Sequence, residues 1–232
     1  MYKLKNTADC FHCDHKLNMF CHMSDDQLAE VNEKRKEVHF KAGETIFKTG
    51  GPLTHMICVT SGMVKVYLED PHTDKRIILG IIKPVELVLG PGFLVDESHH
   101  FTAVAMEDTT ACYIEISHHK KIMATNPDYS IAIVQHVNEK VIKHYEKMLC
   151  LTHKHTHGKM ADILLYLSDK IYNNDVFDTK LSRQDLADLT AMTKETTIRI
   201  LKEFSEEGII VCKNNHFEIL EREKLEKISI SG

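Results

Sequence analysis

The stretch Leu181-Ser-Arg-Gln-Asp-Leu-Ala-Asp-Leu-Thr-Ala-Met-Thr-Lys-Glu-Thr-Thr-Ile-Arg-Ile-Leu-Lys-Glu-Phe204 predicts two short amphipathic helices joined by a tight turn. Ser182 and Asp185 resemble a capping box, so the first helix is expected to begin there. Ala191 and Met192 mark the turn, and Thr193 is suited to cap the second helix. The pattern is that of a helix-turn-helix.

The second helix is expected to separate its side chains onto two faces. Its core face would consist of Thr197, Ile200, Leu201 and Phe204. A helix that enters the major groove of DNA must expose donors and acceptors on its other face. Arginine can hold guanine O6 and N7 together, and glutamate can accept from a cytosine amino group, each for about 1–3 kcal/mol of discrimination. We therefore predict base contacts from Lys194, Glu195, Ile198 and Arg199.

A second set of polar residues is predicted to contact DNA phosphates and so fix the register of the helices. The members of this set are Ser182, Arg183, Gln184, Thr193 and Lys202. The same residues also suit the solvated face of an ordinary helical hairpin.

The pattern also resembles a known family, and the resemblance extends far beyond the two helices. Ser182-Arg-Gln-Asp-Leu-Ala-Asp-Leu-Thr, Lys194-Glu-Thr-Thr-Ile-Arg-Ile-Leu-Lys-Glu-Phe and Glu207-Gly-Ile-Ile resemble the DNA-binding domain of the CRP/FNR family of bacterial transcription regulators. Lys41-Ala-Gly-Glu-Thr-Ile-Phe-Lys-Thr-Gly and Thr60-Ser-Gly-Met-Val-Lys-Val-Tyr-Leu resemble its cyclic-nucleotide-binding-type β-roll. The resemblance implies a homodimer, an inverted repeat in double-stranded DNA as target, and RNA polymerase as partner.

Length and composition agree with a two-domain regulator. The 232 residues, 43% of them hydrophobic, are enough for two modest cores. The formal net charge of −5 requires that DNA affinity come from a local basic surface, with strong salt dependence. No run approaches the roughly 18 apolar residues of a membrane span, and the first residues lack an apolar signal core. We expect a cytoplasmic protein with no membrane partner.

Four segments are predicted along the chain, and together they define an α+β fold. They are a cysteine-rich arm over 1–24, a sensor β-roll over 25–125, a dimerisation helix over 126–152 and a winged helix-turn-helix domain over 153–232. Short β-rich runs between Lys36 and Ile116, punctuated by turns such as Gly50-Gly51-Pro52, predict a double-stranded β-helix or jelly roll. A hairpin turning at Asn214-Asn215 would form the wing.

The predicted dimerisation helix carries an apolar seam with charged flanks. Its members, spaced alternately by three and four residues, are Val134, Val137, Val141, His144, Met148 and Leu151. Such a seam is typical of coiled-coil pairing, although packing against the β-roll is an alternative.

The sensor segment departs from cyclic-AMP-binding relatives. Those relatives hold the ribose through Gly-Glu and the phosphate through Arg-Ser, whereas this chain has Val85-Glu86 and His99-His100. Histidine is mostly neutral near pH 7 and lacks the bidentate fork of arginine, which disfavours cyclic AMP. An effector pocket near Glu86, His99, His100 and Thr102 stays open, as does a β-roll that serves only as a scaffold.

The cysteines offer a second sensor hypothesis. Cys10, Cys13 and Cys21 form a C-x2-C-x7-C cluster, and Cys112 matches the fourth ligand of the oxygen-sensing branch, which holds a [4Fe–4S] cluster. The seven-residue gap is longer than that branch normally has. Three alternatives stay open: an iron–sulfur cluster, zinc with help from neighbouring histidines, or no metal.

The remaining cysteines and two adjacent histidines are not expected to bind a metal or an effector. Cys58, Cys150 and Cys212 lie in apolar runs and are predicted to be core residues. His118 and His119 are predicted to lie on the surface.

Two further function classes compete with DNA binding, although we predict that the chain is not an enzyme. A cupin-like metal-dependent enzyme would use the β-roll histidines, but adjacent His99 and His100 would point to opposite faces of a strand. A cyclic-nucleotide-binding adaptor would need nucleotide affinity without the arginine.

Overall fold

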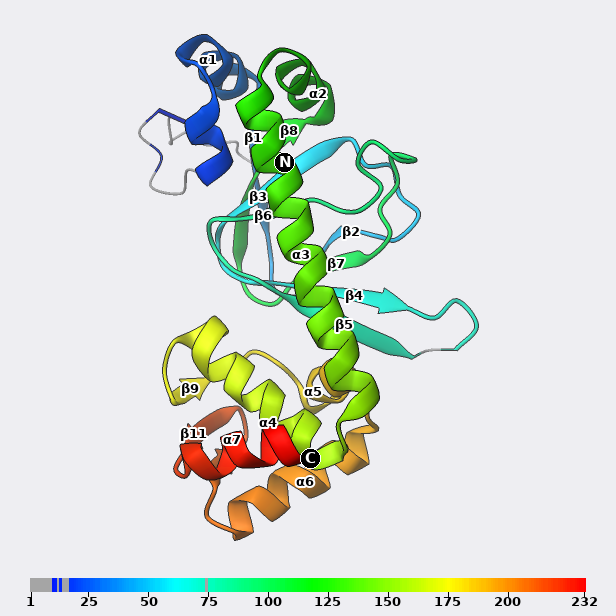
Figure 1. Cartoon of the computed structure of the whole chain (residues 1–232), viewed down its shortest axis with the longest axis vertical. Coiled ribbons are helices and arrows are strands. Elements are labelled where there is room, and N and C mark those ends of the chain that lie inside the picture. Colours follow the sequence, from blue (N-terminus) through cyan, green and yellow to red (C-terminus); the bar gives the residue numbers. More distant parts are fainter. Residues whose placement is uncertain (1–9, 12, 14–16, 74) are drawn as a thin grey trace. The chain divides into compact units, whose positions relative to one another are not determined.

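The computed structural model describes residues 10, 11, 13, 17–73 and 75–232 (Figure 1). The chain forms two compact units. The first contains the described residues up to Val66 together with Ile81–Ile142, and the second contains the described residues of Tyr67–Gly80 together with Lys143–Gly232.

Two four-stranded sheets form the β-roll. One sheet has the order β1-β8-β3-β6 and the other the order β2-β7-β4-β5. The strands are β1 (Lys36–Phe40), β2 (Thr45–Phe47), β3 (His55–Ser61), β4 (Val64–Glu69), β5 (Arg76–Ile82), β6 (Glu86–Val88), β7 (Thr102–Ala105) and β8 (Thr109–Glu115). Every pairing with a recorded register in these sheets is antiparallel. The predicted jelly-roll architecture is confirmed.

Three short helices accompany the first sheet. They are η1 (Asn18–His22), α1 (Asp25–Lys34) and α2 (Ile116–Thr125). Helix α1 begins at a capping box in which the Ser24 hydroxyl accepts from the Gln27 amide and the Gln27 side chain accepts from the Ser24 amide. Apolar side chains from η1, α1 and β3, among them Phe20, Val31 and Met56, share one buried cluster.

The prediction that His118 and His119 lie on the surface is wrong, because both are buried. His119 Nδ1 lies 2.5 Å from the Tyr129 hydroxyl, and its ring stacks against Phe20. Burial lowers the pKa of His119 to about 3, so the ring is neutral. The reason is topological: β8 continues directly into α2, whose inner face is covered by η1 and by the next helix.

That next helix, α3 (Pro127–His153), is 27 residues long. Tyr129 and Ile133 are buried on one side of it, whereas the large apolar side chains on its other side are exposed.

The second unit contains a winged helix. Its elements are α4 (Thr156–Tyr166), the π-helical turn η2 (Leu167–Tyr172), β9 (Val176–Asp178), α5 (Arg183–Thr190), α6 (Lys194–Glu206), β10 (Ile210–Lys213), β11 (His216–Ile219) and α7 (Arg222–Ser231). The three strands form a sheet in the order β10-β11-β9, and the hairpin turns at Asn214 and Asn215 as predicted. Ala191 joins α5 to α6 in the left-handed conformation, with φ of 51°. No helix within the described part of the chain is long and apolar enough to cross a membrane.

Candidate DNA-reading surface and sensor sites

Side-chain caps fix the starts of both helices in the helix-turn-helix. At α5, the Ser182 hydroxyl accepts from the Asp185 amide at 3.1 Å, and the Asp185 carboxylate accepts from the Ser182 amide at 2.9 Å. At α6, the Thr193 hydroxyl accepts from the Thr196 amide at 3.2 Å. Because each cap satisfies amides that lack partners inside the helix, the direction of the α6 axis is set by local chemistry.

The outward face of α6 exposes the four residues predicted to contact bases. Lys194, Glu195 and Arg199 are exposed, and the Ile198 side chain between them is 46% exposed. The opposite face is buried through Thr197, Ile200, Leu201 and Phe204. Lys194, Glu195, Ile198 and Arg199 therefore form one exposed stripe on α6, in which Ile198 is the apolar member.

Arg199 is not isolated on that stripe. Its Nη1 donates to Glu203 Oε1 at 2.6 Å, and Glu203 Oε2 accepts from His157 Nε2 at 2.7 Å. Hydrogen bonds from His157 and Arg199 hold the pKa of the Glu203 carboxyl below its usual range. Neither Glu203 nor His157 was predicted to be part of the DNA-reading surface. The Arg199–Glu203 spacing of four residues on a helix was the available signal.

The five residues predicted to contact phosphates have different surroundings. Ser182, Gln184, Thr193 and Lys202 are exposed. Arg183 instead reaches the wing: its Nη2 donates to the Asn214 carbonyl oxygen at 2.6 Å and to Cys212 Sγ at 3.0 Å. Its guanidinium carbon also lies 5.1 Å from the centre of the Phe217 ring. Arg183 therefore ties the start of α5 to the β10–β11 hairpin.

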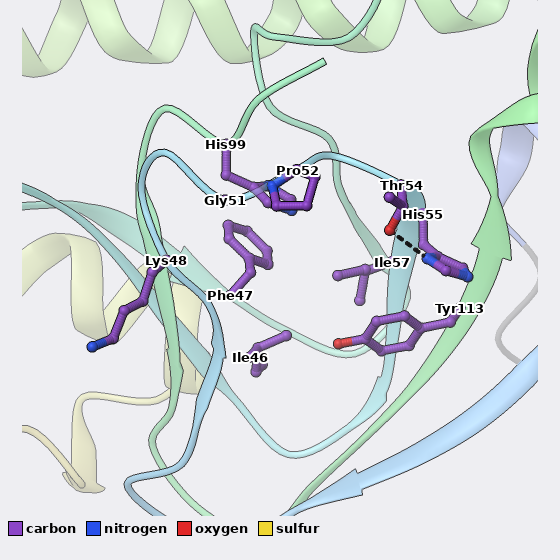
Figure 2. A pocket seen from close by; sticks show the side chains of 10 residues that line it. All are labelled: Ile46, Phe47, Lys48, Gly51, Pro52, Thr54, His55, Ile57, His99 and Tyr113. Atoms are coloured by element: carbon purple, nitrogen blue, oxygen red, sulfur yellow. Dashed lines mark hydrogen bonds between the residues drawn. The ribbon is translucent and has the colours of Figure 1, made fainter.

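The β-roll contains a cavity of about 280 Å³ (Figure 2). It is lined by Ile46, Phe47, Lys48, Gly51, Pro52, Thr54, His55, Ile57, His99 and Tyr113. The His99 ring stacks on Phe47 with 3.7 Å between ring centres. His99 is 6% exposed, and its Nδ1 has no hydrogen-bond partner among the described residues. Figure 2 shows the Tyr113 hydroxyl directed into the space beside Ile46.

Burial shapes the chemistry of this cavity. It lowers the pKa of His99 and raises that of Tyr113. Both side chains are therefore neutral at pH 7, and both retain hydrogen-bonding capacity. The cavity suits a small, largely apolar molecule with one or two polar atoms.

The structure does not bring the four predicted effector residues together. His99 lines the cavity, and the buried Thr102 hydroxyl instead accepts from the Thr49 amide at 3.2 Å. His100 forms an exposed contact with Asp96 at 2.9 Å. Glu86 pairs with Lys140 of α3 at 2.8 Å.

Three of the four predicted metal ligands lie near one another, together with a cysteine assigned to the core. Cys58 and Cys112 are directly opposite on β3 and β8. Burial raises the pKa of Cys58 to about 12, with smaller contributions from Cys112, Cys13 and Cys10. Cys21 is exposed on η1.

Hydrogen bonds through Arg35 and Asn32 connect Cys112 to the main chain at Cys10. The buried Arg35 donates from Nη1 to Cys112 Sγ at 3.6 Å and from Nε to Asn32 Oδ1 at 3.4 Å. Asn32 Oδ1 also accepts from the Cys10 amide at 2.9 Å. Within the described residues, no three histidine, cysteine or acidic side chains are placed to share a metal ion. Of the neighbouring histidines considered as zinc ligands, His22 is exposed at the end of η1, and His12 and His15 lie outside the described residues.

Comparisons with known proteins agree with this architecture. The chain matches the cyclic nucleotide-binding domain over residues 37–126 and the Crp-like helix-turn-helix domain over residues 158–228. It is 26% identical to electron transport regulator A of Shewanella oneidensis, over 86% of this chain and 80% of that protein. It is 23% identical to the fumarate and nitrate reduction regulatory protein of Escherichia coli, over 88% and 82% respectively.

Solved structures show the same fold. The structure of FixK2 from Bradyrhizobium japonicum matches with a TM-score of 0.77 and 20% identity, over 85% of this chain and 98% of that one. A β-roll followed by a long helix and a winged helix-turn-helix defines a DNA-binding transcription regulator. The chain belongs to the CRP/FNR family of these regulators.

Proposed function

We propose that the protein acts as a homodimer on an inverted repeat in double-stranded DNA, with α6 of each protomer in successive major grooves about 34–36 Å apart. The observation that carries this proposal is the exposed stripe of α6. Arg199 and Lys194 would contact guanine, Glu195 would accept from a cytosine amino group, and Ile198 would contact a thymine methyl group. The exposed α6 face supplies hydrogen-bond donors, an acceptor and an apolar group side by side on one helix.

Phosphate contacts would come from exposed residues at the edges of this stripe. We assign this role to Ser182, Gln184, Thr193 and Lys202. For Arg183 the contacts favour a different role, because both its hydrogen bonds go to the wing. It would hold the wing in position beside the DNA backbone.

Dimerisation would occur through the exposed side of α3. Ile131, Val134, Tyr145 and Met148 have between 55% and 60% of their surface exposed. Together with Asn138 and the half-buried Val141, they recur at alternate spacings of three and four residues, which is a coiled-coil pattern. Of the predicted seam, Val134, Val141 and Met148 lie on this row. Val137, His144 and Leu151 recur seven residues apart and border the row along one side.

The first unit would sense the signal. We propose a small neutral effector that enters the β-roll cavity and hydrogen-bonds to Tyr113 and His99. The second candidate is the redox state of the thiols, which is supported by the gathering of Cys10, Cys13, Cys58 and Cys112 and by relatives named for electron transport and for fumarate and nitrate reduction.

A cluster held by the four predicted cysteines does not fit this arrangement. A [4Fe–4S] cluster needs four converging thiolates, and within the described residues no three histidine, cysteine or acidic side chains are placed to share a metal ion. The transcription regulators among the relatives offer no precedent for catalysis, and family membership supports RNA polymerase as a partner.

Selection from a random DNA pool tests the proposal. The expected product is an inverted repeat, and Arg199→Ala should relax the preference at one base pair in each half-site. Lys202→Ala should weaken all sites alike and reduce the dependence of affinity on salt. Recovery of no preferred sequence, from reduced or oxidised protein, would reject sequence-specific recognition.

A further inference from the structure

Glu203 joins two side chains that come from different helices of the second unit. Arg199 lies one turn before it on α6, whereas His157 lies in the first turn of α4. Both oxygens of the carboxylate are used, one for Arg199 at 2.6 Å and the other for His157 at 2.7 Å. The Arg199, Glu203 and His157 side chains remain 56%, 34% and 43% exposed. The three groups therefore form a connected set that still reaches solvent.

We propose that Glu203 is a positioning residue that sets the base preference of Arg199, and that His157 tunes it by protonation. The inference rests on the proposed role of Arg199 in reading a base. It goes beyond that role because Glu203 would not need to touch DNA.

Glu203 first affects the orientation of the Arg199 side chain. A guanidinium reads guanine only when its plane is aligned with the base edge, and an arginine side chain loses rotamer entropy when it is fixed. The bond to Glu203 uses Nη1 and holds the side chain along the helix before DNA arrives. Fixing a side chain in advance lowers the cost of ordering it in the complex.

Glu203 also affects the charge of the DNA-reading surface. A free arginine on this face would attract any phosphate, which raises affinity for all DNA alike. The Glu203 carboxylate, which holds Arg199 through Nη1, offsets that charge. Glu203 therefore lowers general affinity and raises the ratio of specific to general binding.

His157 makes this balance depend on pH. The charged groups that the structure places against its ring are Glu203 and, through it, Arg199, both on α6; the uncharged Phe204 ring lies 5.8 Å away between ring centres. With a neutral His157 the three groups carry no net charge. Protonation of His157 makes their sum +1 and divides the carboxylate between two cations. DNA affinity should therefore be higher when His157 is protonated than when it is neutral.

The helix offers a matched control. Lys202 and Glu206 form another pair four residues apart on α6, at 3.5 Å. Glu206→Gln removes the same charge from the same helix without touching Arg199. The test compares wild type, Glu203→Gln, Glu206→Gln and Arg199→Ala by fluorescence anisotropy. The probes are the selected operator, an operator with the Arg199-dependent base pair changed in each half-site, and an unrelated duplex.

The expected result is a loss of roughly tenfold in discrimination between the two operators for Glu203→Gln, with tighter binding to the unrelated duplex. Glu206→Gln should tighten binding to all three duplexes and keep the discrimination. Discrimination that is equal in the two glutamine variants, while Arg199→Ala abolishes it, overturns the role of Glu203. If Arg199→Ala leaves discrimination intact, the proposed reading residue itself is wrong.

A further variant tests the effect of His157 protonation separately. His157→Gln keeps a hydrogen-bond donor but does not titrate. Between pH 8 and pH 6 the operator affinity of wild type should rise more than that of His157→Gln. Parallel curves for the two proteins overturn the role of His157.

Discussion

Lys147 of α3 donates a hydrogen bond from Nζ to the main-chain carbonyl oxygen of Leu189, the next-to-last residue of α5. The last carbonyl groups of a helix have no partners within it, and a cation at this end also interacts favourably with the helix dipole. Lys147 therefore caps the first helix of the helix-turn-helix from outside. Burial lowers its pKa to about 8.

This shift predicts how the stability of the second unit depends on pH. An unfolded lysine has a pKa of about 10.4, so between about pH 8 and pH 10.4 the unfolded chain holds a proton that the folded chain has lost. The free energy of unfolding should rise with pH across this window, by at most about 3 kcal/mol from this group. Urea unfolding at pH 7.5 and pH 10 should show this increment in wild type and not in Lys147→Met.

The control for this prediction is Lys143→Met, which alters an exposed lysine on the same helix. It should keep the increment. Cysteine ionisation changes stability in the same pH range but is common to all three proteins, so it cancels in the comparison. An equal increment in Lys147→Met would contradict the assignment.

The exposed apolar row of α3 predicts the oligomeric state. Val134→Glu places a charge within the proposed seam, where a paired helix would have to desolvate it. Light scattering coupled to size-exclusion chromatography should give a dimer for wild type and a monomer for Val134→Glu. Glu139→Gln alters an exposed residue away from the row and should remain dimeric. A dimeric Val134→Glu protein would place the contact elsewhere.

The environments of the cysteines predict an order of chemical reactivity. Alkylation requires the thiolate, and Cys58 is both 4% exposed and raised in pKa to about 12. Cys21 is exposed. Iodoacetamide at pH 7.5, followed by peptide mass spectrometry, should label Cys21 first and Cys58 last, with rates that differ by roughly a hundredfold or more.

Unfolding in guanidinium provides the reference for that experiment, because all seven cysteines should then react at similar rates. A different result would be informative: joint protection of Cys10, Cys13, Cys21 and Cys112 that a chelator removes would show that these four hold a metal.

The turn between β3 and β4 predicts a large effect of a small substitution. Gly62 has φ of 78°, and a Cβ there would lie 2.5 Å from Thr109 Oγ1 and 2.6 Å from the Asp108 carbonyl oxygen. Gly62→Ala should lower the free energy of unfolding by more than about 2 kcal/mol, since backbone strain and a clash with main-chain atoms add. Gly50→Ala has similar strain, with φ of 80°, but an open surrounding. It should cost about 1–2 kcal/mol in the same thermal or urea unfolding experiment.

The elements with strong local signals were predictable. The Ser182 capping box, the Asn214 turn and the apolar face of α6 each follow from neighbouring residues, and each is present in the structure. Strands β6 and β9 have no comparable local signal, because each is three residues long and owes its pairing to a distant strand. The burial of His119 depends likewise on a tyrosine ten residues away and on packing by η1.

Side-chain partners were less predictable than helices. Glu86 was placed near an effector because of its position in a motif, but its charge is satisfied by Lys140, 54 residues later. Cys58 was assigned to the core because it lies in an apolar run. That run gives no indication that the antiparallel register places Cys112 opposite it. Such pairings arise from sheet register, which a single sequence does not contain.

The left-handed Ala191 and the Thr193 cap have a consequence for how this regulator can be reprogrammed. Neither residue belongs to the four-residue stripe on α6, so the stripe can be exchanged without disturbing what anchors the helix. New operator preferences are therefore accessible through a few surface substitutions on α6 that leave the start and the position of the helix unchanged.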